Sequence, residues 1–176
     1  MCLVFSSYYL ERVNLFVCSR LFKEKNMKNY FNIGEFGGVW PRQSLLDLLN
    51  RVRANMGTPV IVTSGARTPE DHVRIYREKL DTANMTADAF VSLVPWGSKH
   101  LPVYGEATLR AVDIIAVNGE GLKRTGLTIA KYVRQAVHEL RKEGIWDDDV
   151  HYAIGIGAMF VHLDVDRDRD ITWEYS

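Results

Sequence analysis

Cysteine is scarce in this chain, and its scarcity limits the metal chemistry that the protein can use. The two cysteines, Cys2 and Cys18, both lie near the amino end, and they are not in Cys-x-x-Cys spacing. Neither a disulfide framework nor a thiolate zinc site is therefore indicated. Any metal site must be built from histidine and carboxylate ligands.

Net charge and clusters of basic residues are also missing. The 176 residues contain 22 basic and 22 acidic side chains, so the formal charges balance. The sequence has no stripe of lysines and arginines that would follow a phosphate backbone, and nucleic acid is not expected as a partner. The length suits one domain with a proper core and is too short for two of ordinary size. The sequence leaves the oligomeric state open.

Residues 1–26 lack the features of a good export signal and of a membrane span. They are apolar, but they have no basic opening, and Glu11 and Arg12 interrupt the apolar run. The run does not reach the roughly 20 uninterrupted apolar residues that a membrane helix needs, so stable membrane insertion is not expected. These residues are either a dispensable extension before a second start at Met27 or an amphipathic helix packed on the domain. Residues 27–176 are predicted to form a single domain.

Hydrophobic periodicity predicts a mixture of helices and strands. Leu45, Leu49 and Val52 recur at helical spacing before Gly57, and Thr68 is followed by a proline and two acidic residues, as at a helix start. The short β-branched runs predict strands, the first of them buried. The expected helices cover 41–57, 68–80, 86–94 and 129–144, and the expected strands cover 59–64, 111–117, 152–156, 159–165 and 171–175. Helices early and strands late indicate an α+β fold, with a small antiparallel sheet and helices packed on one side.

The stretch FVHLDVD, residues 160–166, has one apolar face and one face suited to chemistry. Side chains alternate along a strand, so Val161 and Leu163 point one way while His162 and Asp164 point the other way. An imidazole and a carboxylate side by side suit either a wet surface or a metal site.

Asp113 is a second unusual residue, because its neighbours in the run AVDIIAV are apolar on both faces. A carboxylate in such a strand is costly unless a cation or several hydrogen bonds compensate it. An aspartate bonded to backbone amides at a strand end is the structural alternative. Taken singly, Asp113, His100 and His162 would each more often be structural. Together they offer two imidazoles and one carboxylate, the ligand set that leaves catalytic zinc a fourth position for water.

Four separated motifs resemble a known family. SGART, the triplet S-K-H ending at His100, AVDI around Asp113 and FVHLD around His162 are similar, in order and type, to zinc D-alanyl-D-alanine carboxypeptidases and the related phage endolysin peptidases. The resemblance extends from about Leu45 to the end. It implies a Hedgehog/D,D-peptidase fold and one Zn²⁺ per chain held by His100, Asp113 and His162. Residues 101–112 form a longer interval than is usual in the family, and we interpret them as an enlarged loop between unchanged ligand positions.

The resemblance also implies roles in substrate binding and catalysis. The family's arginine after the Ser-Gly turn corresponds to Arg67, which would hold a substrate carboxylate or peptide oxygen and steady the developing oxyanion, with Ser98 close by. Without the resemblance, Arg67 is better explained as a surface turn arginine.

The general base that many relatives carry just before the last ligand has no direct counterpart here. Strand alternation makes Asp164 a candidate, either as the base or as the partner that orients the His162 imidazole. His151, in the loop before the hairpin, is the other candidate, as an acid that folds over the metal. A solvated loop histidine is the commoner explanation of that position.

Three other patterns carry less functional information. GIGAMF, residues 155–160, is not a dinucleotide-binding fingerprint, because it lies in a hairpin and lacks the third glycine. His72 is expected to be solvated. The run DRDRD, residues 166–170, is expected to be a self-paired, solvated turn.

These features predict a zinc metallopeptidase, a carboxypeptidase or endopeptidase that hydrolyses a peptide bond in the stem or cross-link of peptidoglycan. The alternative is a non-catalytic, zinc-stabilised module of the same fold that binds the cell wall or a protein partner, which the missing base favours. The poor export signal and the endolysin resemblance imply synthesis in the cytoplasm and degradation of the cell wall after bacteriophage lysis or virion delivery. An exported bacterial enzyme is the alternative if residues 1–26 act as a leader. The sequence does not determine which peptide bond is cut, because that choice depends on the shape of the cleft.

Overall fold

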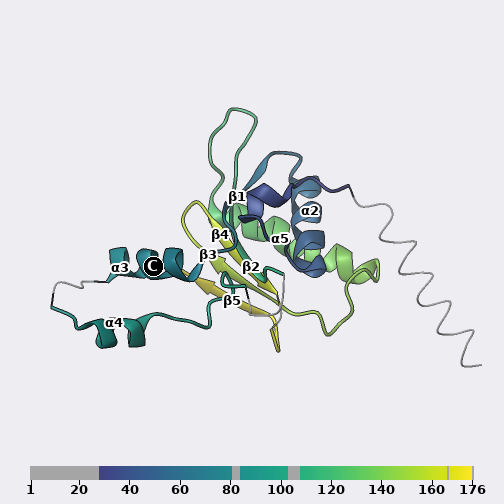
Figure 1. Cartoon of the computed structure of the whole chain (residues 1–176). Coiled ribbons are helices and arrows are strands. Elements are labelled where there is room, and N and C mark those ends of the chain that lie inside the picture. Colours follow the sequence, from purple (N-terminus) through teal and green to yellow (C-terminus); the bar gives the residue numbers. More distant parts are fainter. Residues whose placement is uncertain (1–27, 81–83, 103–107, 166, 176) are drawn as a thin grey trace, which may run out of the picture.

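The computed structural model describes residues 28–80, 84–102, 108–165 and 167–175, which form a five-stranded sheet and its surrounding helices (Figure 1). The helices are the 3-10 helix η1 (Ile33–Phe36) and the α-helices α2 (Gln43–Met56), α3 (Pro69–Lys79), α4 (Ala87–Leu93) and α5 (Gly126–Lys142). The strands are β1 (Val60–Ser64), β2 (Ala111–Ala116), β3 (Tyr152–Ile156), β4 (Val161–Val165) and β5 (Ile171–Glu174). The predicted α+β class is confirmed. The predictions for residues 1–26 lie outside the described residues.

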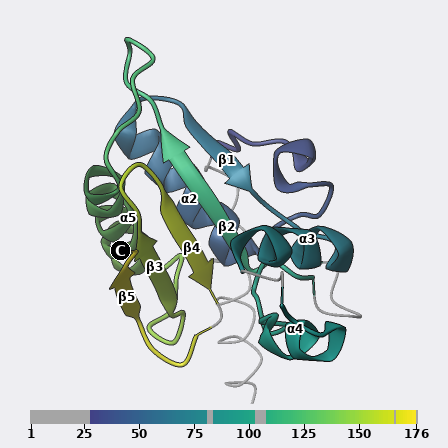
Figure 2. The same cartoon turned by 90° about the vertical axis from the view of Figure 1, so that its left-hand side faces the viewer.

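The sheet is mixed, whereas the sequence predicted an antiparallel one. Its strand order is β1-β2-β4-β3-β5, and every neighbouring pair is antiparallel except β3 and β5 (Figure 2). The turn after β4 reverses the chain, but both edges of β4 are already paired with β2 and β3. The last strand therefore pairs on the far edge of β3, where it runs parallel to its neighbour.

The core lies between one face of the sheet and the helices α2 and α5, which lie together on that side (Figure 1). The shorter helices α3 and α4 lie on the other side of the sheet, so the prediction that the helices pack on one side holds only for α2 and α5 (Figure 1). Val161 and Leu163, which the alternation assigned to an apolar face, are buried, as are most of the other strand residues on that face of the sheet and the apolar residues on the inner faces of both long helices. They include Leu45, Leu49, Val52, Val112, Ile114, Ile129, Val133, Leu140, Ile154, Val161 and Leu163.

The helix ends follow the predicted signals. The α2 helix ends at Gly57, which has a left-handed φ of 60° and donates its N–H to the carbonyl of Arg53. The Thr68 side chain accepts a hydrogen bond from the Asp71 N–H at the start of α3. Among the described residues, no helix is both long and apolar enough to cross a membrane.

The prediction that strand 59–64 is buried was wrong in part. β1 is an edge strand, and the side chain of Ile61 is 42% exposed. A β-branched run indicates a strand but does not say on which side of the sheet a neighbour will pack.

We predict that Leu163→Ala lowers the free energy of unfolding by about 3 kcal/mol, because Leu163 is fully buried between the sheet and the long helices. Urea denaturation would measure the change. Leu127→Ala is the matched control, since Leu127 is 63% exposed and its loss should change stability by less than about 0.5 kcal/mol. Equal effects of the two substitutions would contradict this assignment of the core.

Candidate metal centre

On the face of the sheet opposite α2 and α5, residues of neighbouring strands form a row that runs across the strands. Asp113 on β2 lies directly opposite His162 on β4, and Ser64 on β1 lies opposite Asp113. Residues that face each other in neighbouring strands point to the same side of the sheet. The tertiary structure thus brings an aspartate and a histidine together from positions 49 residues apart in the chain.

His100 reaches the same place from the loop that follows α4. Its Nδ1 lies 3.0 Å from the carbonyl oxygen of Gly65, and its own carbonyl accepts a hydrogen bond of 3.0 Å from the N–H of Arg67. A carbonyl oxygen only accepts, so Nδ1 carries the proton and Nε2 presents a lone pair. Nε2 lies 3.3 Å from Nδ1 of His162. The long interval 101–112 therefore leaves His100 beside the other two residues.

His100, Asp113 and His162 form a group that can hold a metal ion. One ligand atom from each residue lies within 4.8 Å of the others. Nδ1 of His162 is 2.8 Å from Oδ1 of Asp113. When Nε2 of His162 carries the proton and donates a hydrogen bond to the Asp164 carboxylate, Nε2 of His100, Nδ1 of His162 and Oδ1 of Asp113 face one another with lone pairs. Either a proton or a metal cation relieves this repulsion. The donor set therefore fits a cation.

Asp113 and His162 shift each other's pKa. Burial raises the pKa of the Asp113 carboxyl, but hydrogen bonds and charge interactions with His100 and His162 outweigh burial and hold it well below its ordinary value. Burial lowers the pKa of His162, but hydrogen bonds to Asp113 and Asp164 outweigh burial and raise it. Without a metal, the pair therefore favours imidazolium and carboxylate.

We predict opposite pH dependences for the metal-free and zinc-loaded protein. Without metal, the raised pKa of His162 contributes stability that is present below about pH 6.5 and is lost as the pH rises through the raised value. The lowered pKa of Asp113 contributes stability above about pH 4, which is lost only on further acidification. With zinc, protons compete for the ligands, so stability rises with pH over the same interval in which the metal-free protein loses it. Urea denaturation between pH 5.5 and 8 would measure both trends. If the stability of both forms changed with pH in the same direction, the interaction between Asp113 and His162 would be contradicted.

Asp164 lies on the far side of the His162 ring from the ligand atom. Its carboxylate is fully buried, and Oδ2 lies 3.3 Å from Nε2 of His162. The Arg167 guanidinium donates to both carboxylate oxygens, to Oδ1 at 2.5 Å and to Oδ2 by a shorter contact. Burial raises the pKa of Asp164, but hydrogen bonds from His162 and Arg167 outweigh it and hold the carboxyl ionised. This geometry suits a carboxylate that orients the imidazole better than a base that accepts a proton from water.

We predict that Asp164→Asn weakens zinc binding by about 10-fold to 100-fold, because the neutral amide has a single, weaker acceptor oxygen for the hydrogen bonds from Nε2 of His162 and from Arg167. Competition with a chromogenic chelator would measure the affinity. Asp168→Asn, at an exposed position of the same turn, is the control and should leave the affinity unchanged. Equal affinities of the two variants would show that Asp164 does not orient the ligand.

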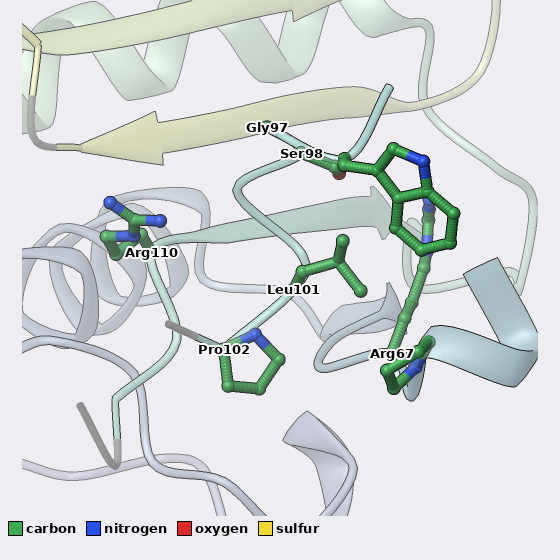
Figure 3. Close-up of a pocket in the computed structure, with 8 residues that line it drawn as sticks. Arg67, Gly97, Ser98, Leu101, Pro102 and Arg110 are labelled. Carbon is green, nitrogen blue, oxygen red and sulfur yellow. The ribbon is translucent and has the colours of Figure 1, made fainter. Parts of the chain in front are cut away.

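Arg67 and Ser98 lie together beside this centre. Arg67 donates from Nη2 to Oδ2 of Asp113 at 3.3 Å, and from Nε and Nη2 to Oγ of Ser64 at 3.1 and 2.8 Å. Among the described residues, these bonds use Nε and Nη2, so the Nη1 protons remain for a ligand. Both residues line a cavity of about 400 Å³, shown in Figure 3, whose walls also include Trp96, Leu101 and Pro102.

His151 lies elsewhere on the sheet. Its Nδ1 is 3.2 Å from Oδ1 of Asp170. The next residue, Tyr152, pairs with Val165, three residues beyond His162 on β4, or roughly 10 Å along the strand. The structure thus brings His100, Asp113, His162, Asp164 and Arg67 together, with Ser98 at the adjoining cavity, and leaves His151 paired with Asp170.

Two minor predictions were wrong. His72 is fully buried rather than solvated, with Nε2 3.2 Å from the carbonyl oxygen of Pro95 and its ring against Trp96, because α3 packs on the loop that follows α4. Two of the described residues of the DRDRD run pair outside it, rather than with each other. Its Arg167 binds Asp164, and its Asp170 binds Arg141 and His151, because the turn lies against the end of the sheet.

Arg167 and Trp173 are site residues that the sequence analysis did not single out. Arg167 follows Asp164 by three residues, a spacing that brings the two charges together in a tight turn. Trp173 lies opposite Gly155 in the sheet. A glycine inside a strand is a signal for the close approach of another group, and Gly155 is the signal in the sequence that could have indicated one.

Comparisons with protein-family models, with curated proteins and with solved structures give no match for this chain.

Proposed function

We propose that this chain is a zinc-dependent peptidase that hydrolyses a peptide bond in the stem or cross-link of peptidoglycan. The observation that carries the proposal is the convergence of His100, Asp113 and His162 within 4.8 Å, from a loop and two strands, beside a cavity that contains an arginine. The resemblance in motif order and type to zinc D-alanyl-D-alanine carboxypeptidases and endolysin peptidases supports it. We infer a Hedgehog/D,D-peptidase-like fold on the same basis.

Two imidazole nitrogens and one carboxylate oxygen are the ligands of many catalytic zinc sites. Nε2 of His100, Nδ1 of His162 and a carboxylate oxygen of Asp113 would hold the ion. When bound, zinc supplies a Lewis acid that polarises the scissile carbonyl and lowers the pKa of the attacking water. Asp164, held by Arg167, would keep the His162 ring oriented so that its lone pair faces the ion.

The substrate's carboxylate or carbonyl oxygen would be bound by Arg67, with Ser98 on the same cavity wall. The guanidinium is already oriented by Ser64 and Asp113, so little conformational entropy is lost when it binds a ligand. A positive charge at this point would also stabilise the negative charge that develops on the carbonyl oxygen. A lytic enzyme acting on the cell wall, delivered by phage lysis or in a virion, is the biological setting that the resemblance favours.

The test is zinc content by mass spectrometry together with hydrolysis of purified peptidoglycan. About one zinc per chain and release of free amino groups from the wall, both abolished by a chelator and restored by zinc, are expected. Mass spectrometry of the released peptides would identify the bond that is cut. Absence of zinc from protein purified without chelators, and after zinc is added back, would refute the proposal.

A non-catalytic zinc module that binds cell-wall peptide is the second candidate. The observation in its favour is that both Asp164 oxygens are hydrogen-bonded to Arg167 or His162, and that His151 is paired with Asp170. Neither the candidate base Asp164 nor the candidate acid His151 is thus presented to the open side of the ligand group. Stoichiometric zinc and binding to peptidoglycan without hydrolysis would favour this module over the peptidase.

A further inference from the structure

The row of residues that contains the candidate ligands continues to the opposite edge of the sheet. Gly155 on β3 lies opposite His162, and Trp173 on β5 lies opposite Gly155. The Trp173 indole leans back over the glycine, and its ring centre is 5.6 Å from that of His162. An aromatic side chain therefore adjoins the candidate metal centre on the side away from Arg67.

Two glycines make room for the aromatic rings. A Cβ atom on Gly155 would lie 2.6 Å from indole carbons of Trp173 and 2.7 Å from a ring carbon of Tyr175. A Cβ atom on Gly157 would lie 2.1 Å from the ring of Phe160. Neither glycine has a positive φ, so it is space rather than backbone conformation that requires them. Gly155 and Gly157 thus provide space for an aromatic cluster.

Phe160, Trp173 and Tyr175 form this cluster, which we call the aromatic wall. The ring centres of Trp173 and Tyr175 are 6.0 Å apart in an edge-to-face arrangement, and those of Phe160 and Tyr175 are 5.2 Å apart. The wall lies on the face of the sheet opposite the hydrophobic core, and Tyr175 is 47% exposed. Rings that are fixed by packing and still exposed bind ligands with little loss of side-chain entropy, which is why tryptophan and tyrosine are common at binding surfaces.

The wall and the Arg67 cavity lie on opposite sides of the candidate metal centre. The two edge strands of the sheet are β1 and β5 (Figure 2). Ser64, which binds Arg67, lies on β1, and Trp173 lies on β5, with Asp113 and His162 on the strands between them. The cavity is lined by two arginines, Arg67 and Arg110, whereas the wall consists of aromatic side chains. A peptide that places a carboxylate at Arg67 and a scissile bond at the metal centre must therefore extend its amino-terminal part toward the wall.

Building on the proposed peptidase function, we propose that the aromatic wall binds the peptide on the amino side of the scissile bond, through its backbone and aliphatic groups. Strands are spaced by about 4.8 Å, so β5 lies roughly 10 Å from His162, which is the span of about three residues of an extended peptide. The wall would then set how many residues before the scissile bond contribute to binding.

The experiment measures binding of a stem peptide, L-Ala-D-Glu-L-Lys-D-Ala-D-Ala, and of versions shortened from the amino end, to the zinc-loaded full chain by calorimetry. Wild-type affinity is expected to fall as amino-terminal residues are removed. Trp173→Ala and Tyr175→Ala should each weaken binding of the full peptide by about tenfold and leave the shortest peptide that still binds unaffected. Tyr175 is exposed, so its variant tests the wall even if Trp173→Ala does not fold.

Trp40→Ala is the matched control, because Trp40 is 39% exposed and lies before α2, and it should bind like the wild type. If the affinity of both wall variants still fell with peptide shortening as steeply as that of the wild type, the inference would be overturned and the peptidase proposal would remain intact. If the wild-type protein held zinc but bound none of the peptides, the proposed role of the aromatic wall in peptide binding would be refuted. Zinc-loaded wild type that shows the length dependence without hydrolysing any peptide would instead refute the peptidase and retain the wall as a binding surface.

Discussion

Replacing His162 by alanine is expected to lower the zinc content from about one ion per chain to about none and to abolish hydrolysis of peptidoglycan. His162 supplies the ligand atom nearest to Asp113, at 2.8 Å from Oδ1. It is also a hydrogen-bond partner of the buried Asp164. With His100 and Asp113 alone, two ligands remain, fewer than the three or four protein ligands of typical zinc sites. Mass spectrometry of the purified variant and a wall-hydrolysis assay measure the two effects.

His138→Ala is the matched control for this substitution. His138 is an exposed residue of α5, on the side of the sheet away from the candidate ligands, so zinc content and hydrolysis should be unchanged. Circular dichroism of both variants would separate loss of metal from loss of folding. A His162→Ala protein that is folded and keeps stoichiometric zinc would refute the ligand assignment.

Replacing Arg67 by alanine is expected to lower kcat/KM by about 100-fold to 1,000-fold, the usual loss when a group that stabilises the oxyanion is removed. The guanidinium lies between Asp113 and the cavity, so its loss removes both the substrate contact and the charge that faces the metal ligand. Zinc should remain bound, because Arg67 is not a ligand. Steady-state kinetics on a soluble stem peptide and zinc analysis measure the two quantities separately.

Arg67→Lys tests the geometry of the interaction. Lysine keeps the positive charge but lacks the planar fork that binds Ser64 and Asp113 together, so most of the loss should persist. Arg74→Ala, a change in an exposed ion pair of α3, is the control and should behave like the wild type. Full activity in Arg67→Ala would leave the arginine with a structural role in the turn.

The local features of the chain were predictable because short-range physics decides them. The spacing of Leu45, Leu49 and Val52 requires a helix with a buried face, and Thr68 with its following proline begins a helix wherever the chain continues. The alternation in β4 likewise placed His162 and Asp164 on one face, since a strand has no other way to arrange successive side chains.

The path of the chain between elements was less predictable. Nothing local in residues 171–174 distinguishes a strand that pairs beside β4 from one that pairs beyond β3, because the choice depends on which edges are already occupied. The same holds for His151, whose position relative to His162 depends on strand register, and for His72, whose burial depends on the packing of α3 against a distant loop.

The sequence by itself determined which residue types are available for a metal site, where the helices and strands run, and which side chains of each strand share a face. It did so because those properties depend on residues within a few positions of one another. Only the tertiary structure decided that His100, Asp113 and His162 meet within 4.8 Å, that Arg167 holds Asp164, and that Trp173 lies over Gly155. Those contacts join residues from different strands and loops, and they exist only once the sheet has assembled in its particular order.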